Sequence, residues 1–358
     1  MTASAERACP RLAGRTSPPA HHAPPCVTRL ARDEKGFALL AVTLVMALLG
    51  VVVTELAFSM RLEAAMVRSY RDAVIARHLA EAGVQQAIRE VLTDSTVQGI
   101  DEDGQVTFYR APQAGAAAKA LPRLPRSHVP LGSGEFSYRI TDEEGRLNIN
   151  ASQPGTLTRL LSALEVEKTE SDIIVDSIED WRDQNDLARI NGAESDYYLK
   201  LPVPYRPRQG NLQDVAELLQ IRGITPELYW GHDDKPGLVD LVTVRSRGLA
   251  ININTAPPLV LKALGLSDAE IGNIVQSRTP QPYPSVPTLY TTRGQFTVNS
   301  ATFRIEAEGV IAGEPRARLV AIVQKVLGAP TAAAPVLIVY SWRFLPPKAR
   351  TEEGQAKG

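Results

Sequence analysis

The chain has 358 residues, of which 44% are apolar, and a formal net charge of −1. This size allows a membrane anchor together with one or two folded domains. Both cysteines, Cys9 and Cys26, precede residue 37, and the chain from residue 37 onward carries 33 basic and 37 acidic residues. That region therefore has no thiol nucleophile and no disulfide, and its acidic balance argues against non-specific nucleic-acid binding.

The first predicted element is a membrane anchor. A charged segment gives way at Gly36 to eighteen uncharged residues, Phe37 to Thr54, close to the ~20 residues that a helix needs to cross a bilayer. The apolar run continues into helix-forming residues instead of a small-residue cleavage site, which distinguishes it from a secretory signal. Basic residues before the anchor favour a cytoplasmic N-terminus, and they place the residues after Leu56 in the periplasm.

The join between Gly36 and Phe37 resembles the processing site of type IV pilins and type II secretion pseudopilins. The resemblance implies that a prepilin peptidase cuts between these two residues, that residues 1–36 are a cleaved leader, and that Phe37 becomes N-methylated. Because a motif this short can also occur by chance, an ordinary signal anchor with an incidental glycine remains an alternative at this point.

Helix-forming residues continue without proline to Leu92, and Val84, Ile88 and Val91 have the spacing of one buried helical face. We therefore predict one helix over residues 37–92, with residues 37–57 in the membrane. The following region, residues 99–134, is rich in Gly, Pro and Ala and is predicted to form turns and loop.

Alternating apolar residues predict a strand over residues 135–141. Strand patterns return only after residue 295, with a hairpin turn predicted at residues 311–315. These later strands are predicted over residues 295–298, 302–310, 316–326 and 336–344. Strands this far apart in the sequence predict one sheet whose connection is an inserted domain.

The inserted region is predicted to be mostly helical and contains a weak repeat. Leu147-Asn-Ile-Asn recurs as Ile251-Asn-Ile-Asn, each before a predicted helix whose first amides the asparagines can cap. Two unrelated helices that start alike are the alternative. The second copy, with the turn Gly265 to Asp268, is similar to helix-hairpin-helix DNA-binding modules. Because an aspartate stands where a phosphate would approach, we expect the fold without DNA binding.

Carboxylates are crowded into two neighbouring segments, Asp180 to Asp186 and Gly192 to Tyr198. Such a loop needs a cation or a basic partner, and hard oxygen ligands suit Ca²⁺. The spacing Asp183-x-Asn185 is similar to the start of an EF-hand loop, but Leu187 occupies the third ligand position. A solvated acidic turn held by arginines stays open as the alternative. The arginines concerned are Arg182, Arg189 and Arg206.

No catalytic motif is present in the sequence. It contains no Gly-x-Ser-x-Gly elbow, no phosphate-binding Gly-Lys-Ser/Thr loop and no His-Glu-x-x-His. After residue 36 the histidines are His78, His128 and His232, which are widely spaced. We therefore expect that the protein is not an enzyme.

Taken together, these motifs resemble the K-type minor pseudopilins of type II secretion over roughly residues 33 to 327. The segments on which this resemblance rests are Gly36-Phe37, Gly134 to Thr141, Leu147 to Asn150, Asp180 to Tyr198, and Ile251 to Pro257. The resemblance implies an α+β, pilin-like fold with a long N-terminal transmembrane helix and an antiparallel sheet, interrupted by a large inserted helical domain of helix-hairpin-helix or SAM-like type. The implied domains are residues 1–36 (leader), 37–92 (helix), 93–146 (the first pilin-like segment, α/β), 147–290 (insertion), 291–345 (the second pilin-like segment, β-sheet) and 346–358 (disordered tail).

The resemblance also implies a function, partners and a cofactor. The protein would sit in the bacterial inner membrane and initiate or cap a periplasmic pseudopilus that supports protein export across the outer membrane. Its partners would be the I-type and J-type minor pseudopilins, the major pseudopilin, the prepilin peptidase and the inner-membrane secretion platform. Calcium would bind in the insertion. The implied ligands are Asp183, Asn185, Glu194 and Asp196, with Asp186 less favoured.

The fifth residue after the predicted cleavage is Ala41, where most pilins have a glutamate that pairs with the N-terminal amine of the subunit ahead. An unpaired carboxylate in the bilayer costs about 2.5 kcal/mol or more. Alanine therefore fits the first subunit of a fibre, which has no subunit ahead of it. The alternatives are an ordinary anchor, a minor pilin of a type IV pilus, and a membrane-anchored DNA-binding receptor that uses the helix-hairpin-helix-like segment.

Overall fold

The computed structural model describes residues 34–111, 117–232, 235–291, 295–326 and 336–347. The chain divides into two compact units, with the boundary between Ala65 and Met66. Most of the predicted leader, including both cysteines, and most of the predicted tail lie outside the described residues. The predictions for these segments stay predictions.

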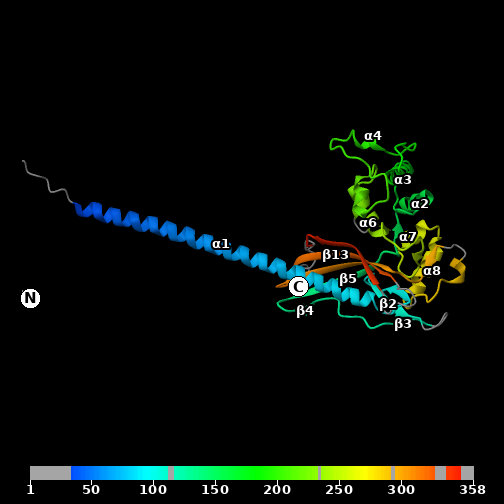
Figure 1. The fold of residues 1–358 in the computed structure, drawn as a ribbon, viewed down its shortest axis with the longest axis horizontal. Coiled ribbons are helices and arrows are strands. Elements are labelled where there is room, and N and C mark those ends of the chain that lie inside the picture. The colour runs from blue at the N-terminus through cyan, green and yellow to red at the C-terminus, as the bar shows by residue number, and fades with distance from the viewer. Residues whose placement is uncertain (1–33, 112–116, 233–234, 292–294, 327–335, 348–358) are drawn as a thin grey trace, which may run out of the picture. The chain divides into compact units, whose positions relative to one another are not determined.

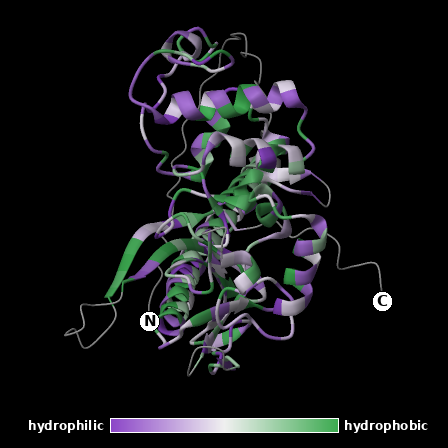
Figure 2. Cartoon of the chain, turned by 90° about the vertical axis from the view of Figure 1, so that its right-hand side faces the viewer, coloured by the Kyte–Doolittle hydropathy of each residue, from purple (hydrophilic) through white to green (hydrophobic). Residues whose placement is uncertain are grey.

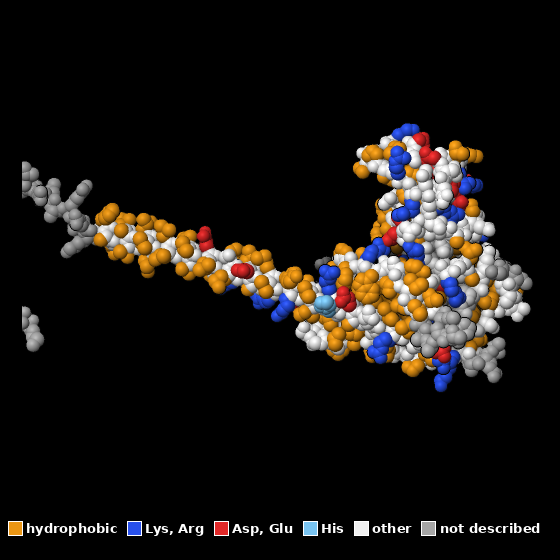
Figure 3. All heavy atoms as spheres, viewed as in Figure 1, with side chains coloured by type: hydrophobic (Ala, Val, Ile, Leu, Met, Phe, Trp, Pro, Cys, Tyr) orange, Lys and Arg blue, Asp and Glu red, His pale blue; other side chains and the backbone are white. Residues whose placement is uncertain are grey.

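Helix α1 (Glu34–Val91) is a single 58-residue helix. In the first unit its apolar side chains are exposed, Phe37 by 80% and Leu48 by 61%. Figure 3 shows hydrophobic side chains along the start of α1, with the first acidic side chains partway along the exposed helix. By length and composition this segment can cross a membrane. The predicted anchor is therefore a helix whose surface suits lipid.

In the second unit, α1 packs on one face of a five-stranded sheet (Figure 1). The buried residues of α1 recur every three or four positions, as one helical face requires. They are Ala76, Leu79, Ala80, Val84, Ala87 and Val91. At Gly309 in the sheet, a Cβ atom would lie 1.9 Å from the Ala76 carbonyl oxygen, so this contact between strand and helix needs glycine.

The sheet is antiparallel throughout, in the order β14-β13-β12-β5-β4. Its strands are β4 (Val129–Leu131), β5 (Gly134–Asp142), β12 (Thr302–Ile311), β13 (Glu314–Val326) and β14 (Val336–Leu345). The predicted hairpin turn is confirmed, because β12 and β13 are joined by Ala312 and Gly313, both with positive φ. The strand predicted over residues 295–298 is reduced to β11 (Phe296–Thr297).

The prediction that residues 99–134 form only turns and loop is wrong. They contribute to a second antiparallel sheet, β1 (Val97–Ile100), β2 (Val106–Arg110) and β3 (Lys119–Ala120), and they contain β4. Val106 and Phe108 alternate with polar residues and pack into the core that α1 covers. The apolar alternation of these short strands outweighs the high local content of glycine and proline.

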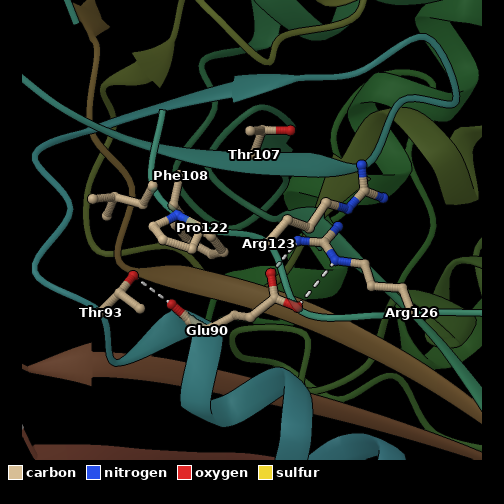
Figure 4. Close-up of a pocket in the computed structure, with 8 residues that line it drawn as sticks. Glu90, Thr93, Thr107, Phe108, Pro122, Arg123 and Arg126 are labelled. Carbon is tan, nitrogen blue, oxygen red and sulfur yellow. Dashed lines mark hydrogen bonds and ion pairs between the residues drawn. The ribbon is translucent and has the colours of Figure 1, made fainter. Parts of the chain in front are cut away.

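The C-terminal end of α1 is held by a buried ion pair. Arg126 Nη2 lies 2.6 Å from Glu90 Oε2, both side chains are 3% exposed, and the Tyr138 hydroxyl donates to the other Glu90 oxygen. Figure 4 shows Arg126 reaching Glu90 from the segment that precedes β4. The adjoining cavity of about 10 Å³ has room for one water at most. The pair is therefore an anchor for α1.

An insertion between β5 and β12 has its own hydrophobic core, which includes Trp181, Tyr198 and Ile253. Its helices are α2 (Pro154–Ala163), α3 (Lys168–Arg182), α4 (Ser195–Tyr198), η1 (Val215–Gln220), α5 (Pro226–Trp230), α6 (Leu238–Leu241), α7 (Pro258–Ala263), α8 (Asp268–Arg278) and α9 (Thr288–Thr291). Two-residue strands pair as β6 (Leu147–Asn148) with β9 (Val242–Thr243), β7 (Gly231–His232) with β8 (Lys235–Pro236), and β10 (Ile251–Asn252) with β11. The insertion is thus mainly helical, as predicted.

The two Asn-Ile-Asn segments have the same local structure. Asn148 Oδ1 accepts from the Asn150 amide, and Asn252 Oδ1 accepts from the Asn254 amide, each at 3.0 Å. These are Asx turns ahead of α2 and α7, and both helices begin with proline near the N-terminus. The prediction that the asparagines cap the helices is therefore wrong in detail, because the side chains bond two residues on, before the helix starts.

Candidate functional site

The site is built from the end of α3 and the loop that follows it. α3 buries one face, including Ile174, Ile178 and Trp181, against the core of the insertion. Asp180 lies in the last turn of α3 and is fully buried, and Asp183 is the residue that ends the helix. Two carboxylates three residues apart on a helix share one side. The helix therefore places both at the start of the loop.

The loop then returns to the end of α3. Arg222 Nη1 donates to the Gly192 carbonyl at 3.0 Å, and the chain enters α4 with Glu194 as the N-terminal flanking residue. A Cβ atom at residue 192 would lie 1.9 Å from Asp180 Oδ2. Glycine at this position therefore lets the loop backbone come against the Asp180 carboxylate.

Three carboxylates meet at this place. One oxygen each of Asp180, Asp183 and Glu194 lies within 4.8 Å of the others. Glu194 is only 1% exposed, and neither of its carboxylate oxygens has a hydrogen-bond partner among the described residues. A buried carboxylate without a partner is costly to a fold. The arrangement therefore lacks a positive partner for Glu194.

The electrostatics of the cluster reflect this crowding. Burial, followed by the charges of Asp180, Asp183 and Asp186, raises the pKa of Glu194 to about 7. Burial also raises the pKa of Asp180, although the Arg189 backbone amide donates to it at 3.1 Å. Near neutral pH these groups repel one another and favour binding of protons or of a cation.

Of the three arginines considered as partners, Arg189 comes nearest to the cluster. Its Nε lies 3.4 Å from Asp180 Oδ1, and its side chain is 45% exposed. Arg182 turns to Glu179 and to the carbonyls of Ile149 and Ser152 instead. Hydrogen bonds from Ser195 lower the pKa of Asp186, and the positive charge of Arg206 lowers it further by a smaller amount. An arginine therefore reaches the rim of the cluster, and Glu194 keeps no bond to it.

The structure brings together two of the predicted ligands, Asp183 and Glu194. Asp196 is exposed and lies 3.3 Å from Lys200 Nζ, while Asn185 uses its Oδ1 to accept from the Leu187 amide at 2.9 Å. Asp186 Oδ1 accepts from the Ser195 amide at 3.1 Å. These three residues shape the loop, and neither Asp186 nor Asp196 belongs to the group of three carboxylates.

The residue missed by sequence reasoning is Asp180. A signal for it exists, because Asp180 occupies a buried position next to Trp181 on a helix whose neighbouring buried residues are mostly apolar. A charged residue at a core position needs a partner. The sequence prediction treats residues 180–186 as one acidic loop, whereas Asp180 belongs to the last turn of α3.

The residues fit a hard divalent cation. The three carboxylates offer up to six oxygens, and Ca²⁺ takes 6–8 oxygen ligands from mono- and bidentate carboxylates, carbonyls and water. Mg²⁺ demands a near-ideal octahedron and suits such a site less well. Trp181, next to Asp180 in the sequence, packs edge to face on Tyr198 with ring centroids 5.4 Å apart, and both side chains are buried. The orphaned Glu194 carboxylate is the observation that favours a cation.

A second acidic cluster lies where β5 passes into the insertion. Asp142 is buried, and its Oδ2 accepts from the hydroxyls of Ser300 at 2.5 Å and Thr255 at 2.6 Å. Burial raises the pKa of Asp142 to about 6. One hydroxyl donor lies in the insertion and the other just before β12, so this carboxylate joins both ends of the connection.

The next two carboxylates are satisfied in the same way. Glu143 accepts from Arg304 Nε at 2.7 Å and from the Thr243 hydroxyl. Burial pushes its pKa upward, but the guanidinium groups of Arg304 and Arg146 outweigh burial and hold the pKa below the ordinary value. Glu144 accepts from the Ala301 amide at 3.2 Å and the Thr302 hydroxyl at 3.1 Å. We call residues 142–144 the acidic junction, which ties the insertion to the sheet.

The predicted processing residues lie at the start of α1. Gly36 and Phe37 are helical, and Ala41 is exposed on the apolar stretch of the helix. Cleavage between Gly36 and Phe37, methylation of Phe37 and a role of Ala41 in assembly stay predictions.

Two family models and several curated relatives of this chain have the same description. Two family models described as type II secretion system, protein K, match residues 139–230 and 251–304. The chain is 28% identical over 189 residues to type II secretion system protein K of Pectobacterium carotovorum subsp. carotovorum, covering 47% of this chain and 56% of the relative. It is 30% identical over 169 residues to the protein of that name from Aeromonas hydrophila, covering 39% and 49%. The chain thus spans about half the length of these relatives.

Its fold is similar to that of a chain in the crystal structure of the GspK-GspI-GspJ complex from the enterotoxigenic Escherichia coli type 2 secretion system. The TM-score is 0.56 at 17% identity, covering 80% of this chain and all of that one. The likeness supports the arrangement of a long N-terminal helix, an antiparallel sheet and a helical insertion.

Proposed function

The chain belongs to the protein K family of the type II secretion system, whose members are minor pseudopilins and not enzymes, and we propose that it initiates or caps a pseudopilus. In this role it would stand at the tip of the periplasmic fibre and support protein export across the outer membrane. The division into leader, helix, two pilin-like segments, insertion and tail belongs to the proposal.

The observation that carries the proposal is the insertion between β5 and β12. A pilin-like sheet extended by a folded block is broader than a subunit that stacks on copies of itself, and a subunit that cannot be followed by another closes a polymer. The acidic junction supports this interpretation, because Asp142 and Glu143 bond to the block through the hydroxyls of Thr255 and Thr243. The same two carboxylates bond to the sheet side through Ser300 and Arg304. A loosely tethered domain could swing aside.

Labelling of isolated pseudopili with an antibody against the insertion tests this role. The expected result is one label at one end of each fibre. Labels in many copies along the shaft would contradict the proposal. Deletion of the gene is expected to abolish export of the system's substrates, and a plasmid copy to restore it.

The proposed partners are the I-type and J-type minor pseudopilins, and in addition the major pseudopilin and the inner-membrane platform. The support is family membership and the fold shared with the chain from the GspK-GspI-GspJ complex. Full-length protein, extracted in detergent from cells that also make the I-type and J-type proteins of the same system, is expected to co-purify with both. Purification of the chain alone from such cells would contradict the proposed partners.

The N-terminal stretch of α1 would anchor the protein in the inner membrane, with residues before Gly36 in the cytoplasm. The prepilin peptidase would cut before Phe37. Substitution of Gly36→Val is expected to leave unprocessed precursor in the membrane, detected by the mass of the purified chain. Normal processing of this variant would contradict the assigned cleavage site.

The cofactor we propose is calcium, bound by Asp180, Asp183 and Glu194. When bound, the ion supplies the positive charge that the described residues do not place beside Glu194. The chain's own contribution is to hold the three carboxylates together: α3 fixes two of them, and Gly192 and Arg222 fix the loop that brings the third. The role of the site is therefore structural, to order the loop between α3 and α4.

A further inference from the structure

The two edges of the five-stranded sheet differ in how they are protected. β4 is a three-residue strand with a proline at its centre, Pro130. Short edges and proline are devices that prevent a sheet from pairing with foreign strands. β14, at the opposite edge, has ten residues, Val336 to Leu345, and contains neither proline nor lysine.

Apart from Arg343, which forms an ion pair with Asp214, the large exposed side chains of β14 are apolar. Six large hydrophobic residues of this strand are exposed by 37% or more. They are Val336, Ile338, Val339, Tyr340, Trp342 and Leu345. Figure 2 shows hydrophobic colouring on the strands that flank the grey connection between β13 and β14. Within the described residues, β14 pairs with β13 and with no other strand.

A single irregularity interrupts the edge. Ser341 pairs with Ile322 and Val339 with Val323, so Tyr340 is an extra residue opposite them. This bulge divides β14 into two regular stretches, one of which consists of Val336, Leu337, Ile338 and Val339. Four extended apolar residues with outward-facing backbone groups form a template for an added strand.

From this asymmetry we propose that the free edge of β14 binds an extended strand of a neighbouring pseudopilin by β-augmentation. The choice of occupant follows from the position of β14 beside α1. Leu337 and Phe344 pack against the core that α1 covers, and the Arg77 guanidinium lies 4.3 Å from the Phe344 ring centroid. A subunit that contacts α1 therefore comes within reach of β14.

The occupant is consistent with the exposed surface of α1. Beyond the membrane segment, α1 still exposes Met66, Val67 and Tyr70 by 57%, 62% and 75%. The inference rests on the proposed function, in which the helix of a neighbouring pseudopilin packs against this surface. Backbone pairing would then add direction and register to a helix contact that is mainly apolar.

Amide hydrogen exchange of the full-length chain in detergent, alone and in complex with the I-type and J-type pseudopilins, tests the inference. We expect peptides covering residues 336–345 to become protected in the complex. The substitution Val339→Lys is expected to weaken the complex by roughly tenfold or more, since lysine on an edge opposes pairing. The matched control is Leu131→Lys on β4, the opposite edge, which is expected to leave affinity unchanged. Both variants are checked for an unaltered unfolding transition.

The outcomes of the hydrogen-exchange experiment distinguish failure of the β14 inference from failure of the proposed function. A complex in which β14 stays unprotected overturns the inference and leaves the proposed function standing. Failure to form any complex overturns both. Protection that rises with concentration of the chain alone indicates a second copy as the occupant, and protection that disappears on truncation after Pro347 indicates the chain's own C-terminal segment. Either of these results also overturns the inference.

Discussion

The acidic junction and the loop cluster are both groups of buried carboxylates, but they differ in their partners. In the acidic junction, hydroxyls, amides and guanidinium groups bond to Asp142, Glu143 and Glu144. In the loop cluster, Glu194 is equally buried and has no hydrogen-bond partner among the described residues. A buried carboxylate with protein partners is compatible with a stable fold, and loss of a partner is costly, whereas one without partners needs something that the chain does not supply.

For Glu143 and Glu194 the difference extends to the direction of the pKa shift. The arginines beside Glu143 outweigh burial and keep the pKa of that carboxyl low, so its charge is stable in the folded protein. Burial and neighbouring acids raise the pKa of Glu194 to about 7, so its charge is unfavourable there. Glu143 therefore loses stabilising interactions as pH falls, whereas burial raises the pKa of its neighbour Asp142 to about 6 in spite of its hydroxyl donors. Glu194 loses stability as pH rises, unless a cation is bound.

The largest expected effect comes from breaking the acidic junction. Glu143→Ala would leave Arg304 partly buried without its carboxylate, and breaking such a pair costs about 3–5 kcal/mol. The free energy of unfolding, measured with urea in detergent, is expected to fall by this amount. The exposed residue Glu102 provides the control, since Glu102→Ala is expected to change stability by less than about 0.5 kcal/mol. Equal effects of the two variants would remove the distinction between a structural carboxylate and a surface one.

The second prediction is a gain in the free energy of unfolding, caused by neutralising Glu194. With chelator at pH 8, Glu194 is charged in both states, but its folded pKa of about 7 exceeds the ordinary 4.5. The charge therefore destabilises the folded state by roughly 3 kcal/mol, and this cost develops as pH rises from about 4.5 to 7. Glu194→Gln is expected to raise the free energy of unfolding in chelator at pH 8 and to change it little at pH 4.5. A loss of stability at pH 8 would show that the carboxylate has a partner after all.

The comparison also shows what a sequence reveals. The long helix, four of the sheet strands and the inserted domain follow from extended periodic patterns and from the distance between strands, so they are predictable. The short strands β1 to β3 are not, because two to five residues between glycines and prolines carry little periodicity. Their pairing depends on the core beneath α1, which is formed by residues far away in the sequence.

The two clusters show the same limit for sites. Asp142-Glu143-Glu144 resembles a solvated charge run, and only contacts with residues about 100 or more positions away, such as Thr243 and Ser300, show that it is buried. In the loop, composition correctly indicates an acidic site, and Asp183 and Glu194 are among its predicted ligands. Asp180, and neither Asn185 nor Asp196, converges with them, because distance along a loop does not determine which side chains meet; the ligand set itself stays a prediction.

The third prediction concerns the ion itself. Calcium at 100 times its dissociation constant is expected to raise the free energy of unfolding by about 2.7 kcal/mol, because it binds the folded site. Asp196→Asn is expected to keep the full calcium effect, since Asp196 is exposed and pairs with Lys200. Asp180→Asn, Asp183→Asn and Glu194→Gln are expected to lose most of it. If Asp196→Asn lost the effect and Asp180→Asn kept it, the ligand set implied by the family resemblance, which contains Asp196 but not Asp180, would be preferable to the three converging carboxylates.

The smallest expected effect decides between the cation and the arginine-held turn. Arg189 is 45% exposed and its Nε is 3.4 Å from Asp180, so the ion pair is worth at most about 1 kcal/mol. Arg189→Gln is expected to lower stability by less than this in chelator. It is also expected to leave stability in calcium nearly unchanged, because the ion compensates the same carboxylates. The matched control is Arg208→Gln, which removes a comparable exposed pair with Glu217 outside the cluster. If Arg189→Gln instead cost several kcal/mol with and without calcium, the arginine would be the partner of the acidic loop, and Glu194 would be stabilised by it and not by a metal.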